Sequence, residues 1–427
     1  MTFAPRSPLP GSASTGFGRH AALGGPLDVR HLIIEGGDRH PAGANGVHHV
    51  ARRLVREQIH AGDDARLVLL RHPDRTDDPG IHDVPLTVLP LHGPRLRGRP
   101  LALDRQILEA LLARTGPRTL FHVHGAREPL LIWLTRVFAR RGIPYVVTVH
   151  GRYSHVDGTR GAPRAAVGLY LRLAERRVLQ GARFVHAVSA EERALLRRFA
   201  PGARIELVAN AAFSSALDAP PAPPAPRARR GDFPSFGYCG RYEIGHKGLD
   251  LLVQGFARYR AEGGGGRLTL VGTGPARATL QAMARDLAVA DAVEVQGPKF
   301  GRDKALAHQD WDYFVQPSRF DGMPIGVLEA ALEGLPLVVT AATGLLGPLG
   351  EFRAGFPIRA ATPEAVALAL GRAGRASHDE WSGLSLRAFA MACAIGDWTL
   401  NAARLRELYQ DIPTPASHTE LVPCASS

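Results

Sequence analysis

The chain has 427 residues, 45% hydrophobic and 22% charged, which is the length and composition of a globular protein with two sizeable cores. No apolar run approaches the roughly 20 residues of a membrane-spanning helix, and the N-terminus lacks the apolar stretch of a secretory signal. The net charge of +12 indicates anionic partners, or simply a proteome that uses arginine as its surface cation.

Short apolar runs alternate with helical periods in the first half of the chain. His31–Ile34 is a predicted buried strand, and a glycine-rich loop at Gly36–Gly46 separates it from a helix. Further predicted strands are Leu67–Leu70, Leu120–Val123, Tyr145–Val149 and Phe184–Val188, with helices at Pro129–Arg140 and Arg164–Leu179. Strands that alternate with helices predict βαβ units and a parallel sheet.

Residues 214–232 are rich in Pro and Ala, so they cannot form a core helix or a central strand, and they are the predicted domain boundary. The alternation then restarts. Predicted strands are Ser235–Cys239, Arg267–Val271, Ala292–Val295, Tyr313–Gln316 and Leu337–Thr340, with helices at Leu249–Arg260, Ala276–Leu287 and Ile325–Glu333.

These patterns predict an α/β protein with two Rossmann-like domains whose parallel sheets face a central cleft. The domains are expected at residues 28–213 and 233–395, followed by a final helix at 396–411. Residues 1–27 and 412–427 read as disordered tails. Three widely separated cysteines form no disulfide framework, which favours a cytoplasmic protein.

The strongest local signal is Val315–Glu329, which contains two acids with seven residues between them. Asp321 lies in a loop after a strand, whereas Glu329 lies inside a helix whose first turn can begin at Pro324. The free amides at the start of that helix can bind an anion, while the carboxylates can bind hydroxyls. The segment therefore suits a sugar nucleotide, although a solvated loop before an ordinary helix is the alternative.

Arg241 and Lys247 follow a strand, where cations often hold a diphosphate, although exposed surface charge is the alternative. Their segment is no P-loop, because His246 occupies the lysine position and no Ser or Thr follows. Gly272 belongs to a GxG turn after a strand, which is weak evidence for a nearby ligand.

His124 and His150 sit at the carboxyl ends of two strands, the edge that lines the ligand crevice in open α/β sheets. Hydrogen bonds to loop backbone are the alternative role. We expect no metal site, since no carboxylate or Cys at close spacing completes a zinc set. The Asp310–Asp312 triplet is expected to serve strand entry rather than metal binding.

Taken in order, these segments resemble glycosyltransferase family 4, the retaining enzymes of the GT-B fold. The resemblance runs over nearly all of residues 30–410. It is carried by the glycine-rich loop and by FHVHG, PYVVTVHG, FVHAVSAEERALL, FGYCGRYEIGHKGLDLLVQGF, LTLVGTGP, VEVQGP and VQPSRFDGMPIGVLEAALEGLPLVV.

The resemblance implies a role for each site residue. Glu329 would bind the ribose hydroxyls, and Asp321, which replaces the usual Glu, would face the donor sugar. Arg241 and Lys247 would hold the diphosphate, and a histidine, His124, would lie near the sugar. The remaining expected site residues are His150, Gly322, Met323, Pro324, Ile325, Gly272, Gly36 and Gly37.

Three departures from the family pattern affect these roles. Asp321 is one methylene shorter than Glu, Asn210 is not followed by the usual Gly, and the loop Gly36–Gly46 is longer than usual.

The implied activity is transfer from a UDP-, GDP- or ADP-sugar to a glycan or lipid-linked acceptor, with retained configuration and no cofactor or metal. An epimerase of the same fold and a non-catalytic sugar-nucleotide binder are the alternatives. Nucleic acid is not expected as a partner, because the chain lacks an aromatic stacking platform or a dense basic stripe. The basic positions Arg172, Arg176, Arg177, Arg193, Arg197 and Arg198 predict a peripheral contact with anionic membrane, and a solvated helix face is the alternative.

Overall fold

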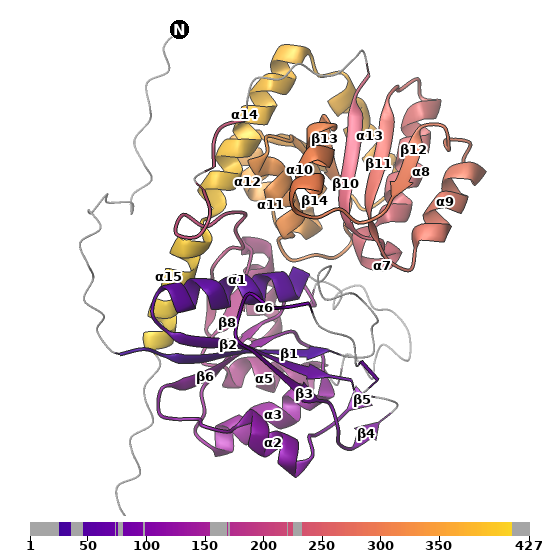
Figure 1. Cartoon of the computed structure of the whole chain (residues 1–427). Helices are drawn as coiled ribbons and strands as arrows, with labels where there is room; N and C mark the ends of the chain where they lie inside the picture. The colour runs from indigo at the N-terminus through magenta and orange to yellow at the C-terminus, as the bar shows by residue number, and fades with distance from the viewer. Residues whose placement is uncertain are drawn as a thin grey trace, which may run out of the picture.

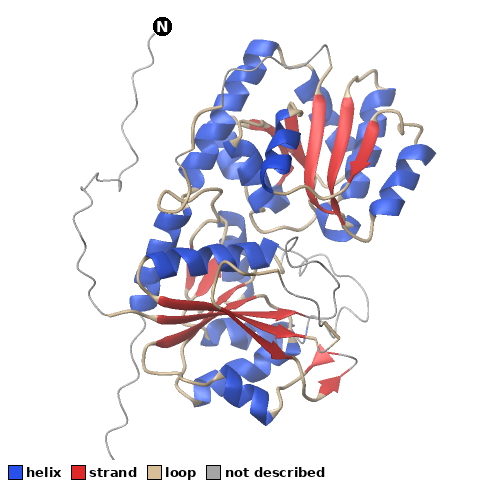
Figure 2. Ribbon diagram, in the orientation of Figure 1, coloured by secondary structure: helices blue, strands red, loops and turns tan. Residues whose placement is uncertain are grey.

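The computed structural model describes residues 25–35, 46–72, 74–75, 80–96, 99–153, 169, 171–219, 221–224 and 233–411. These residues form two α/β domains, one from each half of the chain (Figures 1 and 2). Gly36 and Gly37, most of the predicted glycine-rich loop and nearly all of both tails lie outside the described residues.

The N-terminal domain is built on a seven-stranded parallel sheet with strand order β3-β2-β1-β6-β7-β8-β9. Its strands are β1 Asp28–Glu35, β2 Asp64–Arg71, β3 Leu86–Pro90, β6 Thr119–His124, β7 Tyr145–Thr148, β8 Val185–Ala187 and β9 Ile205–Leu207. Its helices are α1 Gly46–His60, α2 Arg105–Leu111, α3 Pro129–Arg140, the π-helix η3 Leu171–Glu175, α5 Arg176–Gly181 and α6 Ala190–Phe199. A two-stranded antiparallel ribbon, β4 Arg95–Leu96 with β5 Arg99–Pro100, lies apart from the sheet.

The C-terminal domain repeats the plan with six parallel strands in the order β12-β11-β10-β13-β14-β15. The strands are β10 Ser235–Arg241, β11 Arg267–Thr273, β12 Val293–Gln296, β13 Tyr313–Gln316, β14 Leu337–Thr340 and β15 Gly355–Ile358. The helices are α7 Ile244–Lys247, α8 Leu249–Ala261, α9 Arg277–Asp286, α10 Gly301–Gln309, α11 Ile325–Leu332, the short 3-10 helix η4 Ala341–Thr343, α12 Leu346–Phe352, α13 Pro363–Gly374, α14 His378–Ile395 and α15 Trp398–Gln410.

The prediction of an α/β protein with two parallel sheets is confirmed. The central strands β6, β7, β13 and β14 are buried along their whole length, as parallel strands covered on both faces must be. The prediction missed the edge strands β3, β9 and β15. β3 is half exposed, and β15 contains Gly and Pro, so neither reads as a continuous apolar run.

In both sheets the strand order reverses beside the first strand of the domain. The chain passes from β1 outward to β2 and β3, then returns to place β6 on the other side of β1. The C-terminal domain does the same, with β10 lying between β11 and β13. Ligands of open α/β sheets bind at such a reversal, beyond the carboxyl ends of the strands.

The last helix, α15, leaves the C-terminal domain and packs beside α1 on the N-terminal sheet (Figure 1). Trp398, Leu405 and Leu408 are buried in the same apolar cluster as residues of α1 and β1. Arg406 at its far end makes a bidentate ion pair with Asp63, with N–O distances of 2.8 and 3.0 Å. The N-terminal core is therefore completed by residues from the far end of the chain. None of the described helices has the length and apolar character needed to cross a bilayer.

Candidate functional site

Lys247 and Asp321 meet at the strand reversal of the C-terminal domain. Asp321 lies in the loop after β13, and Lys247 ends the short helix α7, which follows β10. The Lys247 Nζ lies 2.6 Å from Oδ2 of Asp321. The same oxygen accepts hydrogen bonds from Gln316 Nε2 at 2.9 Å and Ser318 Oγ at 3.1 Å. Three donors on one oxygen hold this carboxylate in a fixed position.

A second carboxylate–lysine pair lies on the neighbouring helices α10 and α11. Lys304 Nζ donates to Oε2 of Glu329 at 2.8 Å. Burial alone favours the neutral acid, but the charge of Lys304 and this hydrogen bond lower the pKa of Glu329 below its ordinary value. Glu329 is therefore ionised near neutral pH and can accept hydrogen bonds from hydroxyl groups. Sequence reasoning missed Lys304, because α10 carries no recognisable motif.

The loop containing Asp321 contacts the N-terminal domain at His150 and Gly151. Gly151 has a φ of +75°, and a Cβ built there would lie 2.6 Å from the backbone carbon and oxygen of Asp321. A Cβ on Gly322 would lie 2.8 Å from the backbone nitrogen of Gly151. Only two glycines allow the two backbones to approach so closely. The predicted residues Asp321, Gly322 and His150, which come from different domains, are thus brought together.

Further contacts join the start of α11 to the N-terminal domain. Asn210 Nδ2 donates to the backbone oxygen of Met323 at 2.8 Å, so Asn210 holds this loop although no Gly follows it. Ile325 packs against the apolar cluster of the N-terminal domain. Pro324 is the N-cap residue, and the helix begins at Ile325. That the backbone amides of this segment bind the nucleotide-sugar donor remains a prediction.

Arg241 ends β10, with its Nη2 3.7 Å from Oε2 of Glu243, and its side chain is about one-quarter exposed. Gly272 has a structural reason to be glycine, since a Cβ there would lie 1.8 Å from the backbone oxygen of Gly240 on the adjacent strand. A contact between Gly272 and the nucleotide-sugar donor remains a prediction. In the Asp310–Asp312 triplet, Asp312 Oδ2 accepts hydrogen bonds from Ser235 N and Oγ, which ties β10 to the entry of β13.

The two predicted histidines bond to each other rather than to loop backbone. His124 Nδ1 lies 3.0 Å from Nε2 of His150, and His124 Nε2 lies 2.8 Å from Nδ1 of His31. Burial lowers the pKa of His150 to about 3 and holds the pKa of His124 well below its ordinary value. Both rings are therefore neutral at physiological pH. His31 was not among the predicted site residues.

Two family models match the chain, one on each domain. Residues 45–211 match the glycosyl transferase 4-like domain, and residues 233–374 match glycosyl transferases group 1. The chain belongs to the group 1 glycosyltransferases. The first region contains every strand of the N-terminal sheet except β1, and the second contains the whole C-terminal sheet with the Lys247–Asp321 and Lys304–Glu329 pairs.

Relatives of this glycosyltransferase differ in what they are named for. A glycogen synthase from Halorhodospira halophila is 31% identical over 191 residues, which is 43% of this chain and 39% of that protein. A GDP-mannose-dependent alpha-(1-6)-phosphatidylinositol monomannoside mannosyltransferase from Mycobacterium tuberculosis is 26% identical over 298 residues, which is 64% of this chain and 74% of that protein. The match thus spans about two-fifths of the length of the glycogen synthase.

Solved structures share the fold of this glycosyltransferase. Sucrose-phosphate synthase from Thermosynechococcus elongatus superposes with a TM-score of 0.69 at 20% identity, covering 90% of this chain and 98% of that one. Anabaena Alr3699/HepE, in complex with UDP and glucose, gives a TM-score of 0.66 at 15% identity, covering 90% and 100%. These neighbours identify the architecture as GT-B.

Proposed function

We propose that the chain is a retaining hexosyltransferase that moves a sugar from a nucleotide-sugar donor to a glycan or lipid-linked acceptor. The observation that carries the proposal is the pair of lysine–carboxylate contacts, Lys247–Asp321 and Lys304–Glu329, near the strand reversal of the C-terminal sheet. This arrangement supplies cations for phosphate beside carboxylates for sugar hydroxyls.

Each group has a distinct role in this proposal. Lys247 and Arg241 hold the donor diphosphate and stabilise the charge that develops on it as the glycosidic bond breaks. Glu329 binds the vicinal ribose hydroxyls, and Lys304 keeps its carboxylate ionised for that task. Asp321 faces the transferred sugar. Because Lys247 contacts Asp321 directly, a diphosphate bound to Lys247 would lie close to Asp321, the acid that faces the sugar.

Transfer with retention then follows from positioning rather than from a protein nucleophile. The acceptor hydroxyl attacks the anomeric carbon from the face that the diphosphate leaves, and a donor phosphate oxygen takes the hydroxyl proton. The contact of Gly151 with the Asp321 loop brings the two domains together around the reacting groups, which limits access of water. No step in this scheme uses a metal ion or cofactor.

The donor is best identified by ligand-detected NMR with UDP-glucose, GDP-mannose and ADP-glucose. UDP and GDP-mannose are named for a structural neighbour and for a relative, respectively, so both belong in the panel. We expect one donor to bind, and its sugar to be transferred only when an acceptor glycan is added. Conversion of the donor alone to an epimer would instead support an epimerase. Binding without turnover across acceptors would support a non-catalytic binder.

A contact with anionic membrane is a second part of the proposal. In the described residues, Arg197 and Arg198 lie on the exposed side of α6, and Arg177 is exposed on α5. Such basic surfaces are attracted to anionic lipid at low ionic strength. Flotation with anionic vesicles should show association at low salt that disappears at high salt, and no association at low salt would contradict it.

A further inference from the structure

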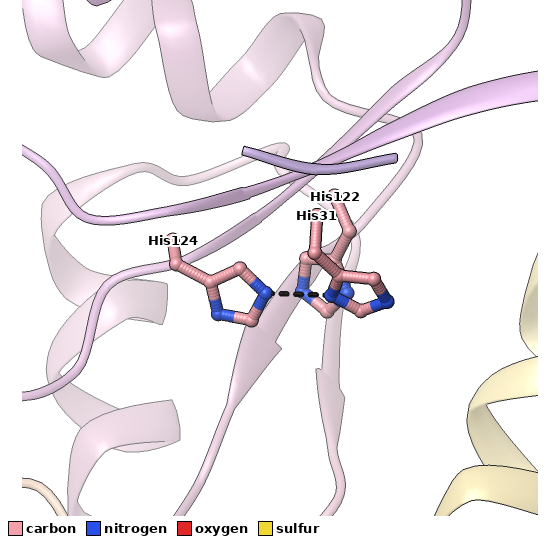
Figure 3. A group of neighbouring side chains, drawn as sticks. All are labelled: His31, His122 and His124. Atoms are coloured by element: carbon pink, nitrogen blue, oxygen red, sulfur yellow. Dashed lines mark hydrogen bonds between the residues drawn. The ribbon is translucent and has the colours of Figure 1, made fainter. Parts of the chain in front are cut away.

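Four buried histidines lie on one face of the N-terminal sheet, beneath α1 and α15, and a fifth, half-buried histidine follows at the edge of the sheet. They are His31 on β1, His122 and His124 on β6, His150 just after β7, and His186 on β8. His31 is in register with His122 on the adjacent strand. Figure 3 shows three of these rings gathered together, with His124 directed at His31. Burial lowers the pKa of all five, so each ring is neutral and carries one proton.

A carbonyl oxygen fixes the direction of the first hydrogen-bonded chain. His186 Nε2 lies 2.7 Å from the backbone oxygen of Val208, which only accepts, so Nε2 is protonated and Nδ1 is not. Nδ1 of His186 therefore accepts the hydroxyl proton of Thr148 at 2.9 Å. The Thr148 oxygen then accepts from His122 Nε2 at 2.6 Å, and His122 Nδ1 accepts from the hydroxyl of Tyr409, also at 2.6 Å.

The same logic orients the second chain. Here the fixed acceptor is the side-chain oxygen of Gln58, since an amide oxygen only accepts hydrogen bonds. The Gln58 oxygen lies 2.8 Å from His31 Nε2, and the Gln58 nitrogen is buried without a hydrogen-bond partner. His31 is therefore protonated at Nε2 and accepts at Nδ1.

The second chain ends beside the Asp321 loop. His31 Nδ1 accepts from His124 Nε2 at 2.8 Å, and His124 Nδ1 accepts from His150 Nε2 at 3.0 Å. His150 Nδ1 is therefore left unprotonated. Among the described residues, this nitrogen has no hydrogen-bond partner, and it is not among the polar atoms that are buried without one. His150 precedes Gly151, which touches the Asp321 loop, so a free acceptor nitrogen lies beside the donor site.

A metal site is the competing explanation for part of this cluster. Ring nitrogens of His31, His122 and His124 lie within 4.8 Å of one another, and imidazole is a common metal ligand. All six ring nitrogens of these residues already have hydrogen-bond partners, however. A cation would have to displace protons shared at 2.6–3.0 Å, so the geometry favours an ordered proton network.

We infer that this network fixes the tautomer of His150, so that its Nδ1 accepts a hydrogen bond from a sugar hydroxyl in the cleft. Gln58 and His31 are then positioning residues, which act on the site without touching the substrate. The tautomer itself follows from the hydrogen bonds alone, whereas the sugar hydroxyl as its partner rests on the proposed transferase function.

Long-range 1H–15N NMR on the uniformly labelled, full-length protein tests the tautomer directly, with His150 assigned by a His150→Gln variant. At pH 7 we expect His150 to have a protonated Nε2 and an unprotonated Nδ1. A protonated Nδ1 would overturn the inference. Changes in the ring nitrogens of His31, His122 and His124 on adding Zn²⁺ at stoichiometric concentration would also overturn it, in favour of a metal site.

The role of a positioning residue is tested with Gln58→Met, which keeps the side-chain length but removes both hydrogen-bonding ends. The network then has no preferred direction, so His150 should show a mixture of tautomers. The competent fraction falls from nearly all to about half, so kcat/KM for the donor should fall about twofold. The control is Gln180→Met, since Gln180 bonds only the backbone of Pro201 at the surface.

A single unchanged tautomer in Gln58→Met, at unaltered thermal stability, would refute the positioning role. If the wild-type tautomer is as expected but no donor is ever turned over, the failure lies in the proposed function, because the NMR measurement needs no activity.

Discussion

The buried histidines should make the fold sensitive to mild acid. Burial lowers the pKa of His31 and His186 from 6.5 to about 4, and that of His150 to about 3. In the unfolded chain these rings titrate near 6.5, so between about pH 6.5 and 4 the unfolded state binds more protons than the folded state. Stability is therefore fully present above about pH 6.5 and is lost as the pH falls toward 4.

The magnitude follows from the width of this window. Between pH 7 and pH 5, each such histidine should lower the free energy of unfolding by about 2 kcal/mol, since one pH unit inside the window corresponds to about 1.4 kcal/mol. Summed over the three rings, the effect is about 6 kcal/mol, which is comparable to the whole stability of a typical domain, about 5–15 kcal/mol. Most paired carboxylates titrate at lower pH and contribute little in this range.

Urea unfolding followed by tryptophan fluorescence at pH 7, 6 and 5 measures the effect. His31→Gln should remove about one histidine's share of the pH dependence, whereas His60→Gln, at the exposed end of α1, should leave it unchanged. Equal free energies of unfolding at pH 7 and pH 5 in the wild-type protein would show that the buried rings are not neutral in the folded state, and would refute the reasoning.

The remaining predictions concern the cleft. Lys247→Ala should weaken donor binding in calorimetry by about 1.5–3 kcal/mol, the range for a hydrogen bond to a charged group. The control Arg267→Ala, at an exposed strand end, should leave donor affinity unchanged. If the two variants bind the donor equally well, Lys247 is not part of the site. Glu329→Ala should raise the donor KM and weaken binding of the free nucleotide, whereas Asp321→Ala should mainly lower turnover. If both variants bind the nucleotide as tightly as the active wild type, the roles of the two acids are misassigned. Gly151→Ala should lower turnover, because the new Cβ would lie 2.6 Å from the backbone of Asp321 in the other domain. Circular dichroism should show that the domains stay folded. Normal turnover would mean that this contact is not required.

The parts of the structure that could be predicted from sequence are those encoded by local pattern. The position of Asp321 before a helix and of Glu329 inside it follows from periodicity and from Pro324, and the structure places both residues there. The apolar runs likewise predict β6, β7, β13 and β14, because strands buried on both faces leave little room for other residues.

The lysine–carboxylate contacts within the site could not be predicted from local sequence pattern. Lys304 reaches Glu329 over 25 residues and Lys247 reaches Asp321 over 74, and such contacts depend on how the helices are placed on the sheet. The histidine network did leave a signal. His122 and His124 alternate on a strand that is otherwise apolar, so both must point to one buried face, and a buried polar face needs partners.

The return of α15 to the N-terminal sheet also constrains the order of folding. The ribosome releases the N-terminal domain first, yet its core lacks Trp398, Leu405 and Leu408 until nearly all of the described chain has been made. During synthesis, the apolar surface of α1 must wait uncovered while the whole C-terminal domain emerges, and exposed apolar surface of this kind favours misassembly. A nascent chain stalled after residue 395 should therefore expose its N-terminal domain to proteases that the finished protein resists.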